Sequence, residues 1–176
     1  GVAHPYREKV LESQENDGNK VVNSIILTEH APISFYKLMA HFLININTDF
    51  LSKVSNIIFI RHPKEIIASY CKVIPHPKME DIGIEKQYEL YNQLVSIDNS
   101  PIVLDSKYLL KNPKLALQKL CLLLEIPFEE KMLKWEKGAR KEDGIWAKYW
   151  YKNVHNSTGF LPYIEKEINL KNSNLE

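Results

Sequence analysis

An arginine and a serine eight positions apart are the residues of this sequence best suited to bind an anion. Arg61 follows the apolar run of residues 56–60, and Ser69 lies in the helical pattern that Pro63 opens. A strand would then deliver a fixed cation to the start of a helix, where anions are stabilised. Only three of the 23 basic residues are arginines, and a guanidinium binds phosphate or carboxylate through paired hydrogen bonds. We therefore predict an anion site at Arg61 and Ser69.

The same segment also fits a structural role. In that alternative, Arg61 pairs with a surface carboxylate in a turn, and Ser69 is a small helix residue that packs against a sheet. The neighbouring elements are needed to weigh the two interpretations.

Strands and helices alternate along the chain. Apolar periodicity predicts strands at residues 33–36, 56–60 and 102–104, and helices at residues 38–46, 64–73, 83–97 and 115–124. The strand at residues 56–60 is apolar throughout, so we expect it in a sheet covered on both faces. This order predicts an α/β fold, a three-layer α/β/α domain with a mostly parallel sheet.

Three polar residues follow the predicted strands: Lys37, Arg61 and Asp105. In open parallel sheets, ligands bind beyond the carboxyl ends of the strands, because loops and helix N-termini converge there. We expect these side chains to lie at one edge of the sheet. Asp105 is also in position to cap the following helix, and Asn112 precedes the helix after that.

Composition limits the classes of partner. The chain has 176 residues, 44% of them apolar, and a net charge of +1, which predicts one globular domain without a broad basic face for nucleic acid or an anionic membrane. No apolar run approaches the ~20 residues that cross a bilayer. Cys71 and Cys121 lie in apolar helical patterns that predict buried thiols and a reducing, cytoplasmic location. The histidines and cysteines lack metal-site spacing, so no metal is expected.

The anion-binding pattern matches a known family. The run of residues 59–63, followed by Ala68, Ser69 and Tyr70, resembles the 3′-phosphate-binding motif of the sulfotransferase superfamily. These P-loop-type proteins use PAPS, 3′-phosphoadenosine 5′-phosphosulfate, as sulfuryl donor. The resemblance implies that Arg61 and Ser69 hold the 3′-phosphate of PAPS. Residues 103–128 and 132–160 are also similar to later segments of such proteins.

The resemblance also suggests residues for the reacting end. Family members carry a lysine and a histidine after a strand at about this place in the chain, the histidine acting as general base. Lys37 and His41 are the candidates here. Their spacing differs from the Lys-x-His arrangement of the cytosolic enzymes, but positions four apart share a helical face. Alternatively, Lys37 ends a strand and His41 packs beneath a helix.

A cluster rich in aromatic residues near the C-terminal end has two interpretations. Arg140, Trp146 and Tyr151 would form a flap over the nucleotide, with aromatic faces on adenine and a cation on phosphate. The other interpretation is a lid that packs on its own core or docks another segment.

The sequence departs from the family in one respect. None of its six glycines belongs to a Gly-x-x-x-Ser/Thr loop of the kind that wraps the 5′-phosphosulfate. We therefore expect that the family's first βα unit is missing from this sequence.

The predicted function is sulfuryl transfer from PAPS to a small-molecule hydroxyl or amine. The alternatives are a truncated or inactive module that binds a nucleotide or a partner, and a P-loop kinase-like protein. Residues 1–165 are expected to form the sulfotransferase-like domain, and residues 166–176 a polar tail.

Overall fold

The computed structural model describes residues 7–71 and 78–165. Its first helices are α1 (Arg7–Glu12) and α2 (Gly18–Val21), the latter continued by a π-helical turn at Val22–Ile26. Short 3₁₀ turns follow at Ala40–Phe42 and Asp49–Lys53. The later elements are β1 (Ile57–Ile60), α3 (Pro63–Tyr70), α4 (Met79–Ile82), α5 (Ile84–Ser96), β2 (Ile102–Asp105), α6 (Ser106–Lys111), α7 (Pro113–Leu123), a 3₁₀ turn at Glu130–Leu133, α8 (Ala147–Trp150) and α9 (Lys152–His155).

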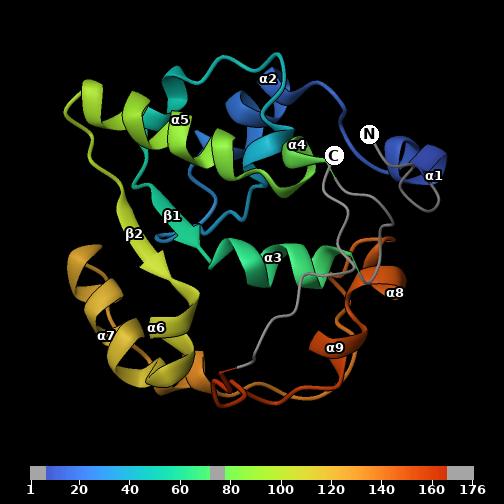
Figure 1. Cartoon of the computed structure of the whole chain (residues 1–176). Helices are drawn as coiled ribbons and strands as arrows, with labels where there is room; N and C mark the ends of the chain where they lie inside the picture. Colours follow the sequence, from blue (N-terminus) through green and yellow to red (C-terminus); the bar gives the residue numbers. More distant parts are fainter. Residues whose placement is uncertain (1–6, 72–77, 166–176) are drawn as a thin grey trace. The chain divides into compact units, whose positions relative to one another are not determined.

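The strands β1 and β2 pair in parallel, with α3, α4 and α5 between them in the chain (Figure 1). The backbone N–H of Ile102 donates to the carbonyl of Asn56 at 2.9 Å, just before β1. Two parallel strands that follow each other in a sheet need a crossover connection, which is usually helical, as it is here. The α/β class and the parallel sheet predicted from the sequence are confirmed, and the sheet of the described residues has two strands.

The prediction for residues 33–46 is wrong. The structure has neither a strand at residues 33–36 nor an α-helix at residues 38–46, and its only regular element in that stretch of described chain is the turn Ala40–Phe42. Phe35 is 78% exposed. A short apolar run forms a strand only where a neighbouring strand pairs with its backbone, and periodicity does not reveal whether that neighbour exists.

Burial of the strands is also less complete than predicted. Within the described residues, Phe59 of β1 is 49% exposed and Val103 of β2 is 47% exposed. On α5, Leu94 is buried, with 2% of its surface exposed, whereas Tyr88 is 67% exposed. The expectation of a sheet covered on both faces is therefore wrong for these residues.

The helix starts predicted at Asp105 and Asn112 are confirmed. Asp105 caps α6 by accepting a hydrogen bond from the backbone N–H of Lys107 at 2.7 Å. Asn112 caps α7 by accepting from the N–H of Leu115 at 3.2 Å. Each cap satisfies a donor that the first turn of a helix cannot pair internally.

The described chain divides into two compact units. Among the described residues, the first unit covers residues 15–71 and 78–104, and its core contains Val22, Phe50, Leu51 and Leu94. The second unit combines residues 7–14 with residues 105–165, and its buried positions include Ala116 and Cys121. The predicted polar tail at residues 166–176 lies outside the described residues.

Both cysteines are free, Cys121 buried and Cys71 partly buried. No helix of the described chain combines the length and the apolar character needed to span a bilayer.

Candidate functional site

Arg61 leaves the end of β1 and folds over the first turn of α3. Its Nε–H donates to Oε2 of Glu65 at 2.8 Å. The Arg61 side chain is 46% exposed and that of Glu65 is 18% exposed. Neither Nη nitrogen of Arg61 makes a hydrogen bond to another described residue. The guanidinium is therefore held at one nitrogen and open at the other two.

The N-terminus of α3 is closed by His62. The imidazole Nδ1 of His62 accepts from the backbone N–H of Lys64 at 3.2 Å. The His62 carbonyl accepts from the N–H groups of Glu65 and Ile66, at 2.9 and 3.2 Å. Pro63 has no N–H to offer. Since these donors are satisfied locally, an anion at this helix start has to be held by side chains.

Ser69 lies on the same side of α3 as Glu65. It is four residues further along, and residues at this spacing share a helical face. Ser69 is exposed, and its hydroxyl makes no hydrogen bond with the rest of the described chain. The spacing of Arg61, Glu65 and Ser69 therefore presents a guanidinium and a hydroxyl on one side of the helix.

Lys37 and His41 do not share a helix. Lys37 lies in the irregular segment before the turn, exposed, with its Nζ 3.7 Å from the sulfur of Met39. Met39 is extended, with φ −96° and ψ 120°, and His41 is in the 3₁₀ turn Ala40–Phe42. The expectation that these two side chains lie on one helical face is therefore wrong.

His41 packs where α4 meets α5. The turn Ala40–Phe42 contacts both helices, and the ring of His41 makes an edge contact with Phe42 at a centroid distance of 4.3 Å. Gly83, between α4 and α5, has φ +66°, and a Cβ there would lie 2.7 Å from Nδ1 of His41. Burial lowers the pKa of His41, and the Asp81 carboxylate partly opposes that shift. A histidine with a lowered pKa is neutral at physiological pH, the form a general base needs.

The residues of the predicted flap belong to a lobe at residues 134–159 of the second unit. Its two ends are joined by a bridge between Lys134 and Gly159. Further in, the N–H of Trp135 donates to the carbonyl of Thr158 at 3.1 Å, and the N–H of Gly138 to that of His155 at 2.9 Å. These contacts close the lobe at its base.

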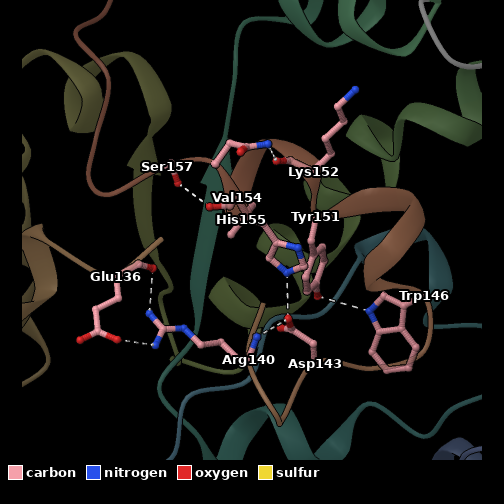
Figure 2. A network of polar contacts seen from close by, with 10 residues as sticks. Glu136, Arg140, Asp143, Trp146, Tyr151, Lys152, Val154, His155 and Ser157 are labelled. Atoms are coloured by element: carbon pink, nitrogen blue, oxygen red, sulfur yellow. Dashed lines mark hydrogen bonds and ion pairs between the residues drawn. The ribbon is translucent and has the colours of Figure 1, made fainter. Parts of the chain in front are cut away.

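Asp143 is the centre of the polar network in this lobe (Figure 2). Its Oδ2 accepts from the backbone N–H of Arg140 at 2.8 Å and contacts Nε2 of His155 at 2.8 Å. The bond from the N–H of Arg140 lowers the pKa of Asp143, and His155 adds to that effect against partial burial. An ionised carboxylate only accepts hydrogen bonds, so we assign the proton of this contact to Nε2 of His155.

Arg140 is turned back along the chain in Figure 2. Its Nη2 donates to the carbonyl of Glu136 at 3.0 Å, and Nη1 lies 3.8 Å from the Glu136 carboxylate. The Arg140 side chain is still 47% exposed. Its cation is accessible to solvent on the surface of the lobe.

Trp146 and Tyr151 contact each other. The indole Nε1–H donates to the Tyr151 hydroxyl at 3.3 Å. Trp146 also covers Gly144, where a Cβ would lie 2.2 Å from the indole ring. Tyr151 makes an edge contact with His155 at a centroid distance of 5.9 Å. The structure thus joins Arg140, Trp146 and Tyr151 through one network around Asp143.

The seven candidate residues fall into three groups. Ser69 lies on α3 and Arg61 lies two residues before its first residue, whereas Lys37 and His41 lie elsewhere in the same unit. Arg140, Trp146 and Tyr151 belong to the second unit. Lys37 and His41 were expected to lie on one helix, and the structure does not place them on one.

Sequence reasoning missed three participants: Glu65, His62 and Asp143. Glu65 was detectable, since it lies four residues after Arg61 and four before Ser69. A histidine directly before Pro63 is a weaker signal, because histidine is not among the preferred capping residues. The contact of Asp143 with His155 spans twelve residues of irregular chain and has no signal in the sequence.

Comparison with known proteins identifies the type of domain. The family model described as "sulfotransferase domain" matches residues 1–169. No solved structure matches this chain.

Two proteins of Arabidopsis thaliana are similar to most of the chain. "Branched-chain-amino-acid aminotransferase-like protein 1" is 37% identical over 164 residues, and "branched-chain-amino-acid aminotransferase-like protein 2" is 35% identical over the same length. Each match covers 91% of this chain and 29% of the relative. The chain therefore spans less than a third of the length of these relatives.

Proposed function

This chain belongs to the sulfotransferase domain family, and from that premise we propose that it transfers a sulfuryl group from PAPS to a small-molecule hydroxyl or amine. The names of the two plant relatives refer to a different enzyme class. Because the match covers 29% of each relative, those names carry no argument about the activity of this chain.

Donor recognition is assigned to α3 and to Arg61, which lies between the end of β1 and the start of α3. The 3′-phosphate of PAPS is a dianion, and it would be bound by the two open Nη groups of Arg61 and the hydroxyl of Ser69. Because Nε is taken by Glu65, the phosphate would approach the guanidinium end-on. This availability of Arg61 and Ser69 on one face is the observation that carries the proposal.

The reacting end is assigned to Lys37 and His41. In the transfer, the acceptor oxygen or nitrogen attacks sulfur in line with the bridging oxygen, the S–O bond to that oxygen breaks, and adenosine 3′,5′-bisphosphate leaves. Neutral His41 would take the proton of the acceptor, and Lys37 would stabilise the charge that develops on the bridging oxygen. Positioning and electrostatics supply most of the rate in such reactions.

Arg140, Trp146 and Tyr151 are assigned to the nucleotide. The exposed guanidinium of Arg140 suits a phosphate, and the aromatic pair suits the adenine ring. We propose that residues 1–165 form one sulfotransferase-like domain, which agrees with a family match running through residues of both units.

A binding comparison tests the donor assignment. The dissociation constants of adenosine 3′,5′-bisphosphate and of AMP are measured for the wild type by calorimetry, with thermal shift as a second readout. The two ligands differ in the 3′-phosphate, so the bisphosphate should bind more tightly and stabilise the protein more. Equal affinities would refute the proposed donor site.

The variant Arg61→Lys tests the guanidinium itself. Lysine keeps the charge but loses the paired donors, so the preference for the bisphosphate over AMP should fall about tenfold. Arg7→Lys on α1 is the matched control and should keep the wild-type preference. An unchanged preference in Arg61→Lys would contradict the role given to Arg61. A protein that binds the bisphosphate but releases no bisphosphate from PAPS would be a binding module instead of an enzyme.

A further inference from the structure

We propose that Glu65 is a positioning residue for donor recognition: its carboxylate holds the Arg61 guanidinium over α3, directed at the 3′-phosphate beside Ser69. The inference rests on the proposed function, and it assigns a role to a residue that neither the motif nor the family match identifies.

The contact between the two residues has the geometry that this role needs. Glu65 Oε2 contacts the Arg61 guanidinium at Nε, at 2.8 Å, and Nε is the guanidinium nitrogen nearest to the side-chain stem. The two Nη groups at the far end therefore stay available. The Glu65 side chain is 18% exposed whereas that of Arg61 is 46% exposed, so the anchor is the more buried partner and the cation faces solvent.

Helix geometry explains why this anchor brings Arg61 toward Ser69. Arg61 precedes the helix and its side chain has several rotatable bonds, so without a partner it samples many directions. The contact fixes its guanidinium at the level of Glu65. Ser69 lies one turn further, about 6 Å along the axis. One turn is a spacing that a single phosphate can bridge between the two side chains.

The carboxylate has an opposing electrostatic effect. A negative charge beside a bound dianion weakens binding, and the pair at the surface is screened by solvent. If the charge effect dominated, Glu65 would reduce affinity for the bisphosphate. Since α3 has no unpaired N–H group in its first turn to orient the phosphate, we infer that the orienting effect of Glu65 dominates.

Two substitutions separate these effects. Glu65→Gln keeps an oxygen that can accept from Nε of Arg61 and removes the charge, whereas Glu65→Ala removes both. The measured quantity is the ratio of the AMP dissociation constant to that of adenosine 3′,5′-bisphosphate, determined by calorimetry on the full chain. Positioning predicts that Glu65→Ala lowers this ratio about two- to fivefold, while Glu65→Gln keeps at least the wild-type ratio.

Other outcomes overturn the proposal. A ratio in Glu65→Ala equal to or above that of the wild type would show that charge repulsion dominates. A ratio in Glu65→Gln as low as in Glu65→Ala would show that the neutral acceptor does not position Arg61.

The background variant Arg61→Ala distinguishes positioning from a general structural role. If Glu65 acts through the guanidinium, adding Glu65→Ala to Arg61→Ala should leave the ratio unchanged. A further decrease in the double variant would overturn the proposal. The matched control is Glu89→Ala, which breaks the Lys86–Glu89 ion pair on α5, also at 2.8 Å, and should keep the wild-type ratio.

The experiment also separates this inference from the proposed function. A wild-type ratio near one refutes the function and the positioning role together. A wild-type preference that Arg61→Ala abolishes and Glu65→Ala leaves intact refutes the positioning role alone.

Discussion

Arg61 and His62 divide two tasks at the start of α3. His62 satisfies the backbone donors of the first turn, and Arg61 supplies two Nη nitrogens that no other described residue binds. Helix starts that bind phosphate commonly use the backbone donors themselves. In the proposed site, recognition of an anion would depend on one guanidinium, so a change at Arg61 should have a larger effect than at sites where the backbone contributes.

The protonation of His41 gives a prediction about stability. Burial lowers the pKa of His41 from its ordinary value of 6.5, so the folded state binds a proton less readily than the unfolded state. The contribution of His41 to stability is fully present above pH 6.5 and is lost as the pH falls through the folded-state pKa. We expect the free energy of unfolding, measured by urea denaturation, to decrease as the pH falls below 6.5.

The variant His41→Asn should remove this part of the pH dependence. His30→Asn is the control, because His30 is exposed, and it should keep the wild-type slope. A His41→Asn protein with the full wild-type slope below pH 6.5 would show that burial of His41 is not the cause.

At the scale of elements, the helices with local start signals are the ones that the sequence predicts well. The cap of α7 illustrates this, because Asn112 and Pro113 adjoin the helix and act within one turn of it. Caps of this kind act through contacts between near neighbours in the chain. Their contribution should be measurable by a single substitution.

We predict that Asn112→Ala lowers the free energy of unfolding by about 1 kcal/mol. The physical reason is the loss of the hydrogen bond that Asn112 accepts from the N–H of Leu115. Chemical denaturation measures the effect. Gln118→Ala, at an exposed site in the same helix, is the matched control and should change stability by only a few tenths of a kcal/mol. Equal stability of Asn112→Ala and the wild type would show that the cap is replaced by solvent.

The sequence predicts α5 and α7 but not residues 33–46, for a physical reason. Helical hydrogen bonds and caps join near neighbours in the chain, so the sequence patterns that predict them lie within a few residues of the helix. A strand depends on a partner elsewhere in the chain, and the partial exposure of Phe59 depends on what packs against it. The placement of Arg61 at the start of α3 and of Ser69 on that helix was predictable for the same reason as α7, because it depends on local helix signals. The network of Asp143 and His155 was not, since it joins distant residues of irregular chain.

At the scale of the whole molecule, the candidate residues are distributed over two units. Arg61 and Ser69 lie in one, and Arg140, Trp146 and Tyr151 in the other. The function proposed above assigns all of these residues to the nucleotide. Binding would then reduce the local opening of segments far apart in the sequence.

Amide hydrogen exchange tests this expectation. With adenosine 3′,5′-bisphosphate, protection should increase both in α3 and in residues 140–151. AMP is the control and should protect α3 less, because it lacks the 3′-phosphate. Protection confined to α3 would mean that the aromatic cluster packs only within its own lobe and takes no part in binding the nucleotide.

The exposed half of β1 has a practical consequence for work in solution. Phe59 and Ile60 are 49% and 36% exposed on a strand, and β-strands with accessible apolar side chains promote self-association. Affinity and exchange measurements are therefore best made at several protein concentrations. A light-scattering signal that rises with concentration, and falls when Phe59 is replaced by lysine, would identify β1 as the surface through which the purified protein self-associates.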